Sequence, residues 1–90
     1  MSVKVNIPWF LRYLKNDAKV AEVNANTVGE CLESLVKKFP IIIDKLFAEN
    51  GKLAPFIDIY VNGQYVDPGE LSQLVQDGDE IHIVTITGGG

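Results

Sequence analysis

The sequence predicts one α+β domain in which β-strands pack on one main helix. Three observations support this class. Alternating apolar residues predict strands near both ends of the chain, a capped amphipathic helix lies between them, and an Asn-Gly pair predicts a hairpin in the second half. With 90 residues, 47% of them hydrophobic, the chain can form one modest core but not two.

The first two strands are predicted to pair antiparallel. Residues 3–7 alternate apolar and polar side chains until Pro8 ends the pattern. Residues 19–23 follow closely enough to form the neighbouring strand. Between them, residues 9–14 are rich in aromatic side chains, which we expect to lie mostly in the core, with an exposed docking patch as the alternative.

The main helix is predicted to begin after Thr27, a good N-cap, with Glu30 completing a capping box. Apolar residues then recur at helical spacing on one face: Val28, Cys31, Leu32, Leu35, Val36 and Phe39. Cys31 lies inside this stripe, so we expect a buried packing residue rather than a nucleophile. Pro40 ends the helix and opens a short second helix, predicted from Ile41 to Glu49.

A third strand is predicted at residues 57–61, and Asn62-Gly63 predicts a type I′ turn into residues 64–66. Leu71, Leu74 and Val75 suit a helical turn packed on the core.

The last strand is predicted from Glu80 to Ile86, after a turn at residues 77–79. Alternation places Ile81 and Ile83 on one face and His82 and Val84 on the other. A position on the strand surface is therefore expected for His82, the one histidine of the chain.

Charge is divided unevenly along a chain of net charge −4. All eight basic residues lie at or before Lys52, and six acidic residues follow it. This balance argues against nucleic acid as a partner. The acidic half either steers the chain onto a basic protein surface, with Asp58, Asp79 and Glu80 as the predicted partner-binding residues, or serves only solubility.

The chemical inventory does not predict an enzyme. The one cysteine and the one histidine lie in different predicted elements, and no glycine-rich loop precedes a helix to hold phosphate. We therefore expect no catalytic role, no metal and no bound cofactor. The longest apolar run is Ile41-Ile42-Ile43, so no membrane span is expected, and a single cysteine suits the reducing cytoplasm.

The chain ends in Thr87-Gly88-Gly89-Gly90, directly after the last predicted strand. Four extended residues reach about 13 Å, enough to carry the terminal carboxylate into the cleft of another protein. A frayed terminus is the alternative that this segment alone leaves open.

The order of elements resembles the ubiquitin-like β-grasp fold, and specifically the MoaD/ThiS family of sulfur carriers. The resemblance covers nearly all 90 residues and rests on residues 27–30, 55–63 and 77–81 and on the terminal Gly89-Gly90. It implies a β-grasp domain, a mixed sheet packed on one main helix, at residues 1–86 and a flexible tail at residues 87–90. Thr85 and Ile86 stand where the family often has proline, and Gly88 where a larger residue is common.

The resemblance also implies a function. An E1-like enzyme would adenylate the carboxylate of Gly90 with ATP, and a sulfur donor would convert it to a thiocarboxylate. Gly88 and Gly89 would thread a passage too narrow for side chains. The acceptor would be an enzyme like the molybdopterin synthase large subunit, with cysteine synthesis or the thiamine pathway also open. A protein modifier conjugated through Gly90 and a plain interaction domain are the other hypotheses.

Overall fold

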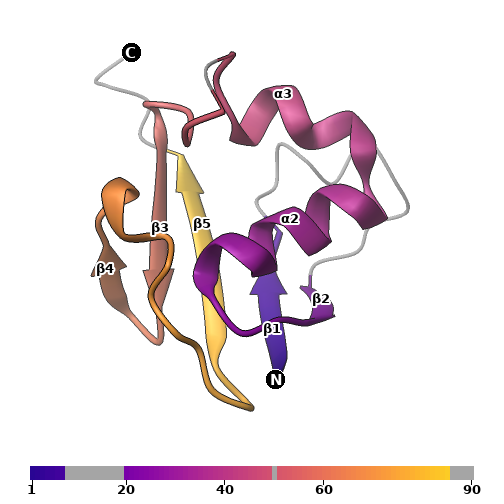
Figure 1. The fold of residues 1–90 in the computed structure, drawn as a ribbon, viewed down its shortest axis with the longest axis vertical. Coiled ribbons are helices and arrows are strands. Elements are labelled where there is room, and N and C mark those ends of the chain that lie inside the picture. The colour runs from indigo at the N-terminus through magenta and orange to yellow at the C-terminus, as the bar shows by residue number, and fades with distance from the viewer. Residues whose placement is uncertain (8–19, 50, 86–90) are drawn as a thin grey trace.

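The chain folds into a five-stranded mixed sheet covered on one face by helices (Figure 1). The computed structural model describes residues 1–7, 20–49 and 51–85. Its elements are β1 (Ser2–Asn6), β2 (Val20–Asn24), α2 (Val28–Lys38), α3 (Ile43–Leu46), β3 (Ile57–Val61), β4 (Gln64–Val66) and β5 (Glu80–Thr85). Short 3₁₀ helices occupy Pro40–Ile42 and Pro68–Glu70. The predicted α+β class, with one main helix on a mixed sheet, is confirmed.

The last strand of the sequence lies at the centre of the sheet, in the order β2-β1-β5-β3-β4. β5 runs parallel to β1, with Val5 facing Ile81, and antiparallel to β3, with Ile59 facing Ile83. The two hairpins, β1–β2 and β3–β4, therefore flank β5. The antiparallel pairing of the first two strands is as predicted.

The capping box sets the start of α2. The Thr27 side chain accepts a hydrogen bond from the Glu30 amide at 3.1 Å, and the Glu30 carboxylate accepts one from the Asn26 amide at 2.9 Å. Two amide groups that the first helical turn leaves without partners are thereby satisfied. The helix ends at Lys38, before Pro40, as the sequence predicts.

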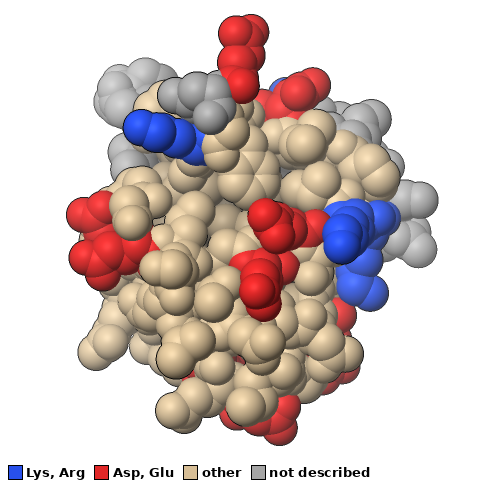
Figure 2. Space-filling model, viewed as in Figure 1, with Lys and Arg blue, Asp and Glu red and all other residues tan. Residues whose placement is uncertain are grey.

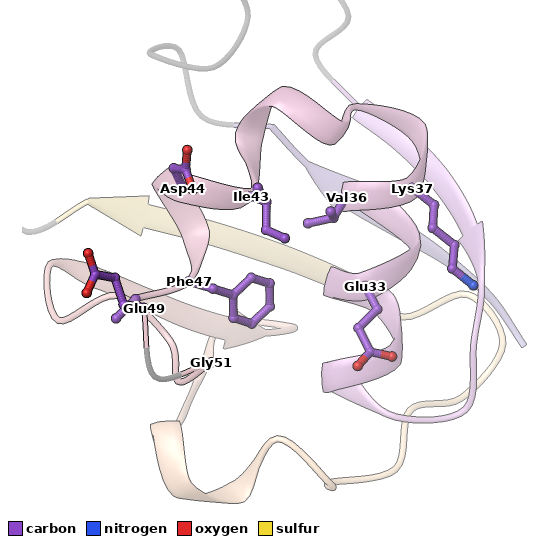
Figure 3. A pocket seen from close by; sticks show the side chains of 9 residues that line it. Glu33, Val36, Lys37, Ile43, Asp44, Phe47, Glu49 and Gly51 are labelled. Atoms are coloured by element: carbon purple, nitrogen blue, oxygen red, sulfur yellow. The ribbon is translucent and has the colours of Figure 1, made fainter.

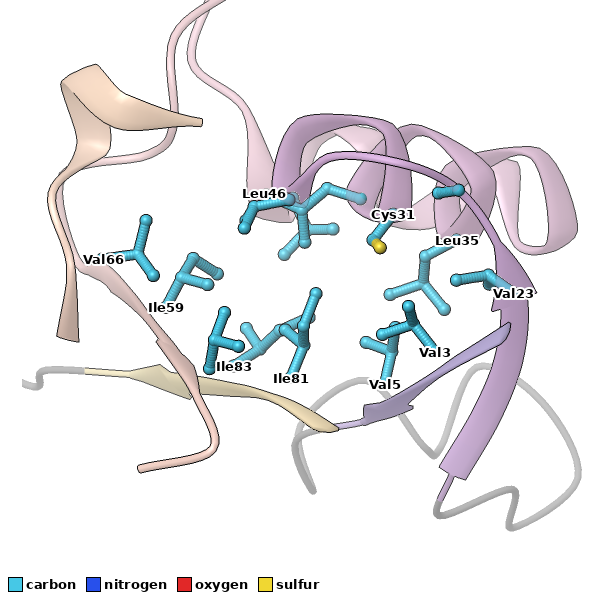
Figure 4. Close-up of a cluster of buried hydrophobic side chains, with 14 of the residues drawn as sticks. Val3, Val5, Val23, Cys31, Leu35, Leu46, Ile59, Val66, Ile81 and Ile83 are labelled. Atoms are coloured by element: carbon cyan, nitrogen blue, oxygen red, sulfur yellow. The ribbon is translucent and has the colours of Figure 1, made fainter. Parts of the chain in front are cut away.

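The core lies between α2 and the inner face of the sheet (Figure 4). Alternate residues of each strand point inward, and the apolar stripe of α2 covers them. The fully buried side chains include Val3, Val5, Val28, Cys31, Leu32, Leu35, Leu46, Ile57, Ile59, Val66 and Ile81. Ile81 and Ile83 are buried and His82 is exposed, as the alternation predicts.

The second helix is shorter than predicted. It ends at Leu46 rather than at Glu49, because Phe47 takes an extended backbone and pairs with Leu53. The Leu46 carbonyl then accepts a hydrogen bond from the Ala54 amide at 2.8 Å. This tertiary pairing outweighs the local preference for helix.

The helical turn predicted around Leu71, Leu74 and Val75 is wrong beyond Leu71. Leu71 keeps helical backbone angles at the end of the Pro68–Glu70 3₁₀ helix, whereas Leu74 pairs antiparallel with Thr27. Here the Val28 amide donates to the Gln73 carbonyl, and the Val75 amide donates to the Asn26 carbonyl. Val75 is buried, Leu71 is half-buried, and Leu74 is 75% exposed. The aromatic run at residues 9–14 lies outside the described residues.

The turn between β3 and β4 has the predicted type I′ character. Asn62 and Gly63 both have positive φ, 51° and 85°. This combination matches the twist of the two strands, and glycine adopts it without strain. None of the helices in the described part of the chain is long and apolar enough to cross a membrane.

Candidate functional site

The best-defined part of the predicted site is β5, the strand that leads into the tail. It is hydrogen-bonded to β1 on one side and to β3 on the other. The pairing with β3 continues to Thr85, which faces Ile57. The Asn6 side-chain amide also donates to the Ile81 carbonyl at 3.3 Å. The last described residues before the tail, Val84 and Thr85, are therefore held by their pairing with β3.

Gly88, Gly89 and Gly90 lie outside the described residues. Five residues follow Thr85 in the sequence, and a chain of that length spans at most about 17 Å. The predicted use of Gly90 therefore requires a partner to bind within about 17 Å of the end of β5, at this end of the sheet.

The outer face of the sheet carries a patch beside this end of β5, which we call the outer patch: Asp58, Tyr60, Tyr65, His82 and Val84. Cross-strand pairs bring these residues together, with Asp58 opposite Val84 and Tyr60 opposite both Tyr65 and His82. The rings of Tyr60 and Tyr65 meet edge to face, with centroids 5.7 Å apart. Tyr65 is 51% exposed and Val84 42%, so apolar surface remains open to a partner.

The titration of the outer patch is shaped by its acidic neighbours. Partial desolvation, and then the charges of Asp58 and Asp67, raise the pKa of the Tyr65 hydroxyl above its ordinary value of 10.0. The hydroxyl is therefore a neutral hydrogen-bond donor at physiological pH.

Asp79 and Glu80 lie at the opposite end of β5 from the tail, about 17 Å from Thr85 along the strand. The Asp79 carboxylate accepts hydrogen bonds from the Gln76 amide at 2.8 Å and from the Asn62 side chain at 3.0 Å. These two bonds lower its pKa from 3.8. Asp79 thus holds the turn before β5, and of the three predicted partner-binding residues only Asp58, opposite Val84, lies near the end of β5 that leads to the tail.

Cys31 is fully buried on the inner face of α2, as predicted. Burial, and then the charge of Glu30, raise the pKa of its thiol from 9.0 to about 11. A buried, protonated thiol is a poor nucleophile, so Cys31 has a packing role.

Within residues 1–7, 20–49 and 51–85, no three His, Cys, Asp or Glu side chains are grouped as a metal site requires. The prediction that ATP and a sulfur donor are used by a partner, and not bound by this chain, remains a prediction.

The outer patch was not identified from the sequence. The alternation predicted that His82 and Val84 point away from Ile81 and Ile83, but it did not indicate which strands lie beside β5. The position of Tyr60 next to His82 depends on the non-local pairing of β3 with β5. Only that pairing turns isolated exposed residues into a surface.

Comparison with known proteins is consistent across sequence and structure. The sequence model of the ThiS family matches residues 5–90, and so includes the terminal glycines. A protein of Archaeoglobus fulgidus named as a sulfur carrier protein is 31% identical over the full length of both chains. The CysO structure from Mycobacterium tuberculosis is 31% identical, with a TM-score of 0.83, covering 94% of this chain and 99% of the other. A chain of the BexX/CysO complex from Amycolatopsis orientalis is 35% identical, with a TM-score of 0.85, covering 98% and 99%.

Proposed function

Since the chain belongs to the ThiS family, within the MoaD/ThiS group of ubiquitin-like β-grasp proteins, we propose that it is a sulfur carrier that acts through Gly90. It is a carrier protein rather than an enzyme. One observation carries the proposal: the ThiS family model matches the chain as far as Gly90, and so includes the tail that follows the central strand of the sheet.

The proposed chemistry takes place at the terminal carboxylate. A carboxylate oxygen of Gly90 attacks the α-phosphorus of ATP in an E1-like enzyme, releasing pyrophosphate and forming an acyl-adenylate. A sulfur nucleophile then attacks the carbonyl carbon and displaces AMP, leaving a thiocarboxylate. A free carboxylate resists attack until it becomes such a mixed anhydride, and the enzyme must exclude water from it.

The rigid anchorage of the tail supports this chemistry. Reaction rates depend on alignment, and a displacement of about 1 Å can cost about 100-fold. β5 pairs with β1 from Glu80 to His82 and with β3 as far as Thr85, so a partner that grips the body of the domain also positions the start of the tail. The outer patch, with its exposed Val84 and Tyr65 beside Asp58, is the surface we propose for this grip.

The acceptor is the least constrained part of the proposal. We propose a biosynthetic enzyme, with one like the molybdopterin synthase large subunit first and cysteine or thiamine pathways as the alternatives. One of the similar chains comes from a BexX/CysO complex, which supports the general idea of carriage to a partner protein. Transfer from the thiocarboxylate to each purified acceptor enzyme of the same genome would identify the pathway.

The test is the intact mass of the chain after incubation with an E1-like enzyme of the same genome, ATP and sulfide. We expect one oxygen to be replaced by sulfur. A chain that lacks Gly90 is the control and should keep its mass. Conjugates of higher mass would instead indicate a protein modifier, and no change in the presence of active enzyme would indicate an interaction domain.

A further inference from the structure

A groove lies between α2 and α3 in the helical layer, and its floor is apolar (Figure 3). Val36 of α2, Ile43 of α3 and Phe47 form the floor, and their side chains point toward one another. Val36 and Phe47 are half-buried and pack against the core. Ile43 is 48% exposed and does not contribute to the core. The groove therefore presents apolar surface that the described residues leave uncovered.

The rim of the groove is acidic. Glu33, Asp44 and Glu49 line it with one basic residue, Lys37. Figure 2 shows this side of the molecule, with acidic side chains over both helices. All four residues are exposed, so the rim carries an excess of negative charge into solvent.

The rim carboxylates differ from those of the turns and caps. Within the described residues, the carboxylates of Glu33, Asp44 and Glu49 take part in no hydrogen bond or ion pair. Five other carboxylates accept hydrogen bonds inside the fold: Glu22, Glu30, Asp67, Asp77 and Asp79. Those five have structural roles, whereas the three at the groove are available to a partner.

We propose that this groove docks an amphipathic helix of another protein, one whose apolar stripe is flanked by Lys and Arg. A groove between two helices suits a third helix, which inserts apolar side chains spaced along one face. Charge complementarity predicts that the residues flanking the apolar stripe of the partner helix are basic, because the acidic rim attracts cationic side chains and repels acidic ones. A second copy of this chain would bring the same acidic rim to the contact, so it is the less favoured occupant.

The groove and the outer patch face opposite directions. α2 packs on the inner face of the sheet, and the outer patch lies on the other face. A helix bound in the groove would leave β5 and the outer patch uncovered. One partner can therefore hold the carrier while another uses its tail. The groove proposal does not depend on sulfur chemistry.

The first test uses an ~18-residue peptide of Leu and Lys, about five helical turns, with Leu along one face. A peptide of the same pattern with Glu in place of Lys is its counterpart. We expect the Lys peptide to shift the amide resonances of Val36, Ile43 and Phe47, with an affinity that falls as salt rises. The Glu peptide should bind at least ~10-fold more weakly.

Surface variants then locate the contact. Ile43→Lys should lower the affinity for the Lys peptide by ~10-fold or more, and Asp44→Lys by several-fold at low salt. Two matched controls should change it far less: Glu70→Lys, the same charge reversal at an exposed residue that does not line the groove, and Val84→Lys on the outer patch. Circular dichroism checks that each variant is folded.

Three results would overturn the proposal. The first is a set of peptide-induced shifts centred on the outer patch, or equal binding of the Glu peptide. The second is a dimer of the free chain that Ile43→Lys dissociates, which would make a second copy the occupant. The third is a change in Trp9 fluorescence caused by Ile43→Lys in the free chain, which would assign the groove to residues 8–19 of this chain.

Discussion

Cys31 illustrates how a reactive residue type becomes a packing residue. Its side chain is fully buried against Val28, Leu32 and Leu35 in the core cluster, and burial raises the pKa of its thiol to about 11. In a sulfur carrier that has a cysteine, the alternative to a thiocarboxylate is a persulfide on the cysteine thiol. The position and protonation of this thiol argue against one, and leave Gly90 as the proposed site of sulfur attachment.

We predict that Cys31→Ala lowers the free energy of unfolding by about 1 kcal/mol or somewhat more, through lost packing. Thiocarboxylate formation by the folded variant should persist, as measured by intact mass. If the folded variant cannot be charged with sulfur, then Cys31 has a chemical role.

The burial of Cys31 also predicts how the free energy of unfolding depends on pH. The unfolded thiol ionises near pH 9.0, but the folded one only near 11. This contribution to stability is complete below pH 9 and is lost as the pH rises through 11. Urea unfolding at neutral pH and at high pH should show the decline in the native chain and a smaller one in Cys31→Ala.

Asp79 shows that an acidic residue can be a structural anchor. We predict that Asp79→Ala costs about 1 kcal/mol in stability, because the Gln76 amide and the Asn62 side chain lose their acceptor. Its pKa is lowered in the fold, so its contribution is present above its ordinary value of 3.8 and is lost as the pH falls below it. Thermal unfolding measures both effects. Glu70→Ala, at an exposed residue whose side chain makes no hydrogen bond within the described part of the chain, is the control and should change little.

Among the elements, those with local signals were predicted best. Thr27 and Glu30 fixed the start of α2, and Asn62-Gly63 fixed the hairpin, because capping boxes and type I′ turns need only neighbouring residues. The errors lie where distant segments compete. Phe47 leaves the helix to pair with Leu53, and Gln73 pairs with Val28, neither of which a local pattern indicates.

The candidate site follows the same division. The glycines of the tail were evident in the sequence, whereas the outer patch depends on pairing between strands more than 20 residues apart, such as Tyr60 with His82. The same pairing separates Asp58 from Asp79 and Glu80, which composition alone had grouped together.

This separation makes a prediction about β3 and β5. Asp58→Lys should slow association with the E1-like enzyme several-fold at low salt, and less at high salt, because Asp58 lies opposite Val84 near the end of β5. Glu80→Lys, at the other end of β5, should have a smaller effect. Stopped-flow association at two ionic strengths measures both. If the association rate changes neither with ionic strength nor with either charge reversal, the acidic residues of the C-terminal half serve solubility alone.

At the scale of the whole molecule, the fold pairs the strand that leads into the tail with β3 up to its last described residue, Thr85. β5 is central and paired on both sides, so the distance from the body to the terminal carboxylate depends mainly on the number of residues that follow Thr85. Tail length is therefore expected to matter more than tail sequence, apart from the glycines that enter the partner.

Deleting Gly90 should therefore abolish adenylation while leaving the fold intact. The deletion withdraws the carboxylate by roughly 3.5 Å, and alignment errors of about 1 Å already cost about 100-fold in rate. Gly89→Val should act similarly for a different reason, since a branched side chain cannot follow glycine through a narrow passage. Gly88→Ala should be tolerated. ATP–pyrophosphate exchange with the partner enzyme measures the reaction, and circular dichroism with a binding assay checks the body of each variant. Full exchange activity without Gly90 would falsify the carrier proposal, because a reactive terminus cannot be dispensable.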